Sequence, residues 1–181
     1  MIYIWLAVAV LVIAGVVVLF NSLVRRRNNT ENTWAQIDVQ LKRRYELIPN
    51  LVATVKGYAA HEAAVFENVT RARADAISAE GPVAQGAAEN QLSQALRTVF
   101  AVAENYPQLK ADTQYLELMR QLDTTESRIA YARQAYNDAV LHYDNAIDTV
   151  PSNLVASVFG FRRRDYFQID ELSRGPVRVD L

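Results

Sequence analysis

The chain lacks several of the residues on which common catalytic sites depend. Its 181 residues include no cysteine, which excludes disulfides, thiol nucleophiles and cysteine-ligated metals but does not identify a compartment. It has two histidines, His61 and His142, and "HEAAV" lacks the second histidine that a zincin helix needs at i+4. It has no G-x-S-x-G motif, and "GPVAQG" lacks the lysine and hydroxyl of a phosphate loop. We therefore predict no catalytic residue, no metal site and no cofactor.

The chain also has few glycines and almost no net charge. The chain has six glycines, and no stretch alternates apolar and polar residues for long, which favours an all-α fold. The formal net charge is −1, so electrostatics give no reason to expect a nucleic-acid partner. Runs of three arginines occur twice, at residues 25–27 and 162–164.

The first 20 residues contain one long apolar run. Residues 2–20, "IYIWLAVAVLVIAGVVVLF", carry no charge, and as a helix they would extend about 29 Å, the thickness of one hydrocarbon core. We predict a transmembrane helix that begins at Ile2 and ends at Phe20, with Trp5 at one membrane interface. A cleaved signal peptide is the alternative, but "LFNSLVRRR" offers no small-x-small cleavage site. We favour a retained anchor.

The basic residues beside this run predict its orientation. Arg25, Arg26 and Arg27 follow the span, and no lysine or arginine precedes it. The positive-inside rule then places the C-terminal body in the cytoplasm.

The body begins with a helical pattern that contains a proline. Apolar residues recur with heptad-like spacing over residues 34–72, which predicts one long helix. The pattern continues through Pro49 without a change of phase, so we expect Pro49 to bend the helix near Tyr45 without ending it. The proline frees the Tyr45 carbonyl, which needs a donor if it is buried. We expect Arg44 to reach a freed carbonyl or a carboxylate on another helix, such as Glu117.

Helix-breaking glycines and prolines divide the rest of the body. "SAEGPVAQG" is expected to end the first helix, a second is expected over roughly residues 88–105, and a third from an Asp112 N-cap to Pro151. "NLVASVFGF" predicts a short helix that closes the bundle, although with its basic end it could instead sit on anionic lipid. The fold class is an N-terminal transmembrane helix followed by an antiparallel bundle of three main helices plus a short C-terminal helix. The expected divisions are an anchor at 1–24, a bundle at 25–160 and a polar tail at 161–181.

Two pairs of residues on the first helix are candidates for contacts between helices or chains. The expected helices differ in length, so an apolar stripe should stay uncovered, and we predict that Ile37 and Leu41 join copies into a homo-oligomer. Arg44 and Glu62 fall on core positions, where an ionised group is rare unless paired. We expect interhelical salt bridges that fix register, with Arg133 as the partner of Glu62. A polar binding site inside the bundle is the alternative.

Four segments of the body carry a family resemblance. They are "NTWAQIDVQLKRRYELIPNLVATVKGYAAHE", "AENQLSQALRTVFAVAENYPQLKA", "TESRIAYARQAYNDAVLHYDNAIDTVPSNLVASVFGF" and "RRDYFQIDE". Together they cover most of residues 32–171, and with them the chain resembles the LemA family. The resemblance implies a bacterial protein with one N-terminal membrane span, an all-helical body and no accepted catalytic residues. It also implies membrane peptidases or TPM-domain proteins as partners, because family members are often encoded beside them.

Together these features predict a single-pass protein of the bacterial inner membrane that contacts the lipid bilayer. We expect a self-assembling scaffold or adaptor with no catalytic activity. The alternative is a small-ligand sensor or an enzyme that uses buried polar residues of the bundle.

Overall fold

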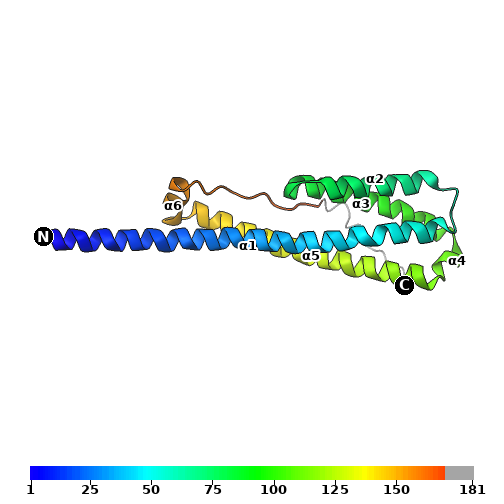
Figure 1. The fold of residues 1–181 in the computed structure, drawn as a ribbon, viewed down its shortest axis with the longest axis horizontal. Helices are drawn as coiled ribbons and strands as arrows, with labels where there is room; N and C mark the ends of the chain where they lie inside the picture. Colours follow the sequence, from blue (N-terminus) through cyan, green and yellow to red (C-terminus); the bar gives the residue numbers. More distant parts are fainter. Residues whose placement is uncertain (170–181) are drawn as a thin grey trace, which may run out of the picture. The chain divides into compact units, whose positions relative to one another are not determined.

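The computed structural model describes residues 1–169. Within these residues the chain forms six α-helices and no strand (Figure 1). The helices are α1 (Ile2–Lys56), α2 (Ala63–Ser78), α3 (Gly81–Glu104), α4 (Pro107–Lys110), α5 (Thr113–Asp148) and α6 (Ser152–Val158). The predicted all-α class with a long apolar N-terminal helix is confirmed.

The chain divides into two compact units, and α1 and α5 contribute to both. Unit 1 consists of Met1–Asp38 and Ala130–Tyr166. Unit 2 consists of Val39–Ile129 and, at the end of the described chain, residues 167–169.

Unit 1 contains the apolar start of α1. The most apolar stretch of this helix has a mean hydropathy of 2.9 and no buried residue, which makes it a candidate membrane span. Where the apolar run ends, α6 and the end of α5 lie beside α1 (Figure 1). The small core at this place consists of Leu23, Tyr143, Ile147, Val155 and Ala156.

Residues 161–166, which follow α6 within unit 1, have no regular secondary structure. Polar contacts hold them to the rest of that unit. The Arg163 guanidinium contacts the Asp148 carboxylate at 2.6 Å. The Arg164 backbone amide donates to Asp144 at 3.2 Å, and its side chain contacts Glu31 at 2.7 Å.

Unit 2 is built from the last third of α1, the helices α2 to α4 and the first half of α5. The two-residue link between α2 and α3 makes them antiparallel neighbours (Figure 1). Apolar positions of the predicted stripes form the core, among them Leu41, Ile48, Leu51, Val69, Leu92, Leu96, Val99, Leu118 and Leu122. Phe167, in the predicted polar tail, is also fully buried.

Two helix boundaries differ from the prediction. The helix expected to continue to residue 72 ends at Lys56, and α2 begins at Ala63. Gly57 disfavours helix by about 1 kcal/mol relative to alanine, and the turn brings the Tyr58 hydroxyl to Asp112 at 3.0 Å. The helix expected from about residue 88 begins earlier, at Gly81, so Gly86 lies inside α3 instead of before it. The chain turns at Gly81 with a φ of +80°, which glycine adopts readily, and Pro82 is favoured in the first turn of a helix.

The helix predicted to start at an Asp112 N-cap is α5, and it begins as predicted. The Asp112 carboxylate accepts hydrogen bonds from the backbone amides of Gln114 and Tyr115 at 2.8 and 3.0 Å. These bonds satisfy two amides that have no partner within the helix. They also lower the pKa of Asp112, with the Tyr115 amide as the largest cause.

Candidate functional site

The most buried charges of unit 2 form one network around Arg44. This arginine is 6% exposed, and it donates from Nη1 to Glu89 Oε2 and from Nη2 to Ser93 Oγ, both at 3.0 Å. Its Nη1 also lies 3.3 Å from Glu126 Oε2. Arg44 thus connects α1 to α3 and α5, and the prediction that it pairs between helices is confirmed. Its partners differ from the suggested Glu117.

Glu89 receives two further donors on its other oxygen. The Tyr45 hydroxyl and Gln85 Nε2 both hydrogen bond to Glu89 Oε1. Gln85 Nε2 also lies 2.8 Å from the Tyr45 hydroxyl and 3.1 Å from the Ala76 carbonyl oxygen. Because both carboxylate oxygens face donors from the chain, this fully buried acid is held without an outside ligand.

Burial dominates the electrostatics of the network. Removal from water raises the pKa of Glu89, and Arg44, Tyr45 and Gln85 offset part of this rise. Burial also raises the pKa of Tyr45, and the neighbouring Glu89 charge adds to it. The network joins side chains of α1, α3 and α5 through buried charged and polar contacts, an arrangement suited to fixing the register of these three helices.

Pro49 lies inside α1, which confirms that the helix continues through it. Its missing amide leaves the Tyr45 carbonyl without a helical donor. Arg73 on α2 supplies one, from Nε at 2.7 Å. The expected need for a donor is therefore confirmed, but Arg73 supplies it instead of Arg44. The bend at Pro49 stays a prediction.

Sequence reasoning missed Glu89 and Arg73. Glu89 precedes Leu92 by three residues and Leu96 by seven, so it lies on the apolar stripe of α3. An acid on that stripe is the same signal that singled out Arg44. Arg73 gave no such signal, because its role depends on a carbonyl in another helix.

Glu62 does not lie in the core of a long first helix. It is half-buried at the N-cap of α2, so the position from which its pairing was predicted is wrong. Arg133 is half-buried on α5 and belongs to unit 1. The pairing of Glu62 with Arg133 stays a prediction.

The two apolar assembly candidates are covered by the chain itself. Ile37 and Leu41 are 0% and 2% exposed. The reason for expecting them to face a second copy therefore does not hold, although self-association itself stays a prediction.

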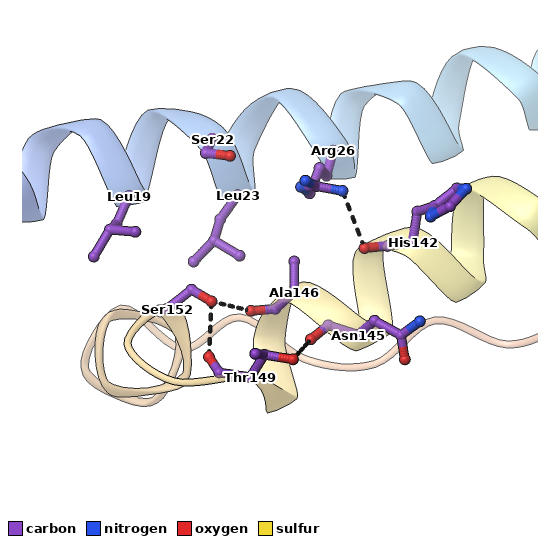
Figure 2. A pocket seen from close by; sticks show the side chains of 9 residues that line it. All are labelled: Leu19, Ser22, Leu23, Arg26, His142, Asn145, Ala146, Thr149 and Ser152. Atoms are coloured by element: carbon purple, nitrogen blue, oxygen red, sulfur yellow. Dashed lines mark hydrogen bonds between the residues drawn. The ribbon is translucent and has the colours of Figure 1, made fainter.

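A second candidate site lies in unit 1 where the apolar run of α1 ends. A pocket of about 370 Å³ lies between α1 and the end of α5, and Figure 2 shows the side chains that line it. Arg26 borders it and donates to the His142 carbonyl oxygen at 3.4 Å. Its lining also includes Leu19, Ser22, Leu23, Asn145, Ala146, Thr149 and Ser152.

Aromatic contacts close this end of unit 1. The Phe20 ring centroid lies 4.9 Å from that of Phe159 and 5.6 Å from that of Phe161. The Arg27 guanidinium lies 5.8 Å from the Phe161 ring centroid. The three predicted membrane-flanking arginines are all exposed. Arg27 contacts the segment after α6, and Arg26 contacts α5.

Comparison with known proteins gives one family and several relatives. The model of the LemA family matches residues 33–181. Magnetosome protein MamQ 2 of Paramagnetospirillum magneticum is 28% identical over 91% of this chain and 70% of its own length. Magnetosome protein MamQ of Magnetospirillum gryphiswaldense is 26% identical over 87% of the chain and 68% of its own length. Protein LemA of Metamycoplasma hominis is 26% identical, over 87% and 72% respectively.

Proposed function

The chain belongs to the LemA family, and from this premise we propose that it is a membrane-anchored helical scaffold without catalytic activity. The observation that carries the proposal is the continuity of α1. One helix, Ile2–Lys56, contains both the exposed apolar run and the residues Arg44 and Tyr45 of the buried network. A continuous helix suits a protein that holds partners near a membrane better than a flexible linker does.

The buried network supports the scaffold over the sensor or enzyme. Its carboxylate already receives Arg44, Tyr45 and Gln85 from the chain itself. A ligand would have to displace one of these donors and leave a buried polar group unsatisfied, which costs about 1–3 kcal/mol.

We propose the inner membrane of a bacterium as the location, with the bundle in the cytoplasm. The basic flank Arg25, Arg26 and Arg27 supports this orientation. The chain has no cysteine, so Tyr3→Cys and Ser78→Cys each introduce one unique thiol. With an impermeant thiol reagent on intact cells, we expect labelling of the Tyr3→Cys chain alone. Labelling of the Ser78→Cys chain instead would reverse the orientation, and release of the protein by carbonate would exclude the anchor.

We further propose that the scaffold self-assembles and that it binds membrane peptidases or TPM-domain proteins. Light scattering on the detergent-solubilised full chain measures its mass, and affinity purification from membranes identifies what it carries. We expect a mass above that of one chain, or a stable membrane-protein partner. A monomer that carries no partner, and whose unfolding temperature rises with a small ligand, would favour the sensor.

A further inference from the structure

We propose that α6 binds the membrane interface, with Leu154, Val158 and Phe159 entering the boundary between the headgroups and acyl chains of an anionic bilayer. The inference rests on the proposed function, because it requires α1 to cross that bilayer. The sequence pattern left closure of the bundle and contact with lipid as alternatives for this segment, and the two faces of α6 allow both.

The first argument is the level at which α6 lies along α1. The apolar run ends at Phe20, and Phe20 contacts the rings of Phe159 and Phe161. Val16 and Leu19 also pack against the core that contains Val155 and Ala156. Contacts on this part of α1 place α6 where the span leaves the hydrocarbon.

The depth of these contacts agrees with interfacial binding. From Val16 to Phe20 a helix rises about 6 Å. Interfacial helices bury their apolar faces about 5–10 Å into the headgroup and acyl boundary. A helix attached to α1 over this interval is therefore held at the depth that such binding requires.

The second argument is the division of α6 into two apolar faces. Val155 and Ala156 are buried against unit 1, with 6% and 3% of their surface exposed. Leu154, Val158 and Phe159 are 66%, 79% and 53% exposed. Residues 149–161 include no charged side chain. The outward face is thus uncharged, and its large exposed side chains are apolar, with Ser157 as an exposed polar residue among them.

The third argument is the charge around this face. Arg163 and Arg164 are held by Asp148 and Glu31, whereas Arg162, directly after the uncharged segment, is exposed. Arg26 borders the cavity beside Leu19 and Ser22 (Figure 2). Arginines just outside an apolar surface attract the phosphates of anionic lipids. The occupant is therefore a lipid with an anionic headgroup.

A fluorophore on α6 tests the inference in the full chain. Val158→Cys carries an environment-sensitive dye on the outward face, and Tyr131→Cys is the matched control on α5, where Tyr131 is 78% exposed. The chains are reconstituted in phosphatidylcholine vesicles containing phosphatidylglycerol. We expect the dye at 158 to emit at shorter wavelength and to be quenched several-fold less by iodide than the dye at 131. Equal quenching at the two positions would overturn the inference.

A dye in the span separates this failure from failure of the anchor. Val10 is 65% exposed, and Val10→Cys places the dye within the apolar run. Iodide access at 10 would overturn the anchor itself, and with it the inference. A dye shielded at 10 but accessible at 158 would overturn the inference alone.

Two further measurements distinguish lipid from other occupants. If shielding at 158 disappears when the chain is diluted with lipid, a second copy covers α6 and the inference is wrong. Measured with acrylamide, a neutral quencher that the vesicle charge does not repel, shielding at 158 should be stronger with phosphatidylglycerol than in phosphatidylcholine alone, and Arg26→Gln with Arg162→Gln should remove this difference. Equal shielding in the two vesicles would overturn the assignment of an anionic headgroup.

Discussion

The Arg73 Nε donates a hydrogen bond of 2.7 Å to the backbone carbonyl of Tyr45. Pro49, four residues after Tyr45, has no amide to fill that place. A donor from α2 thus replaces the helical bond that the proline removes from α1. The two helices are joined at the place where Pro49 removes a hydrogen bond from α1.

We expect Arg73→Met to lower the free energy of unfolding by about 1–3 kcal/mol, because it leaves a carbonyl unsatisfied. In a Pro49→Ala background the new amide donates to Tyr45, so the same substitution should cost less. Urea denaturation of the detergent-solubilised chain, followed by circular dichroism, measures both effects. Arg71→Met is the control, because Arg71 is exposed and pairs with exposed Glu67 on its own helix. Equal losses in the two backgrounds would contradict this account.

The pair of Arg44 and Glu89 gives a second prediction. Removing one partner of a buried ion pair costs about 3–5 kcal/mol, because the other charge is left buried. Arg44→Met should therefore destabilise strongly, and Arg44→Met with Glu89→Gln should lose less than the sum of the two single changes. Denaturation of the four proteins under one condition measures the coupling. Additive losses would show that the two side chains act independently.

The raised pKa of Glu89 predicts a pH dependence. Burial, the largest cause, makes this acid bind its proton more tightly in the folded state than in the unfolded state. Its stabilising contribution is therefore fully present below the ordinary value of 4.5 and is lost as pH rises through the raised pKa. We expect Glu89→Gln to make the fall in unfolding free energy above pH 4.5 less steep. Urea denaturation at a series of pH values measures this slope.

An exposed glutamate provides the control for this slope. The Glu67 side chain is 73% exposed, so Glu67→Gln should keep the wild-type dependence. If Glu89→Gln and Glu67→Gln give the same slope, Glu89 does not titrate in this way.

Local patterns predicted the parts of the fold that depend on neighbouring residues. The uncharged run at residues 2–20 lies in an exposed helical stretch, and the Asp112 cap begins α5. The break after Lys56 escaped prediction because Val69 and Ala72 of α2 continue the heptad phase of α1 by coincidence. Periodicity alone does not distinguish one helix from two helices in the same phase.

Contacts between distant residues could not be predicted to the same degree. Arg44 was recognised by its charge on an apolar face, but the sequence does not indicate which acid faces it across the bundle. Phe167 lies in a largely polar segment, so no period marked it as a core residue. Its burial depends on a position in another helix that has no side chain, and the sequence does not indicate that the two segments meet there.

The position without a side chain is Gly86 on α3, and its contacts give the last prediction. A Cβ added to Gly86 would overlap the Gln168 carbonyl oxygen and lie 3.2 Å from the Gln168 carbonyl carbon. Glycine to alanine inside a helix ordinarily stabilises it by about 1 kcal/mol, but here the backbone of residue 168 must move. We expect Gly86→Ala to destabilise the chain and to speed amide hydrogen exchange at residues 167–169. Phe167→Ala should lower the free energy of unfolding by about 3–5 kcal/mol, and by less in the Gly86→Ala background because both changes release the same segment.

Gly15→Ala is the control, since nothing lies within 4 Å of its added Cβ, and it should leave this exchange unchanged. A Gly86→Ala chain that gains stability, with exchange at residues 167–169 as in the unaltered protein, would refute the packing of this segment against α3.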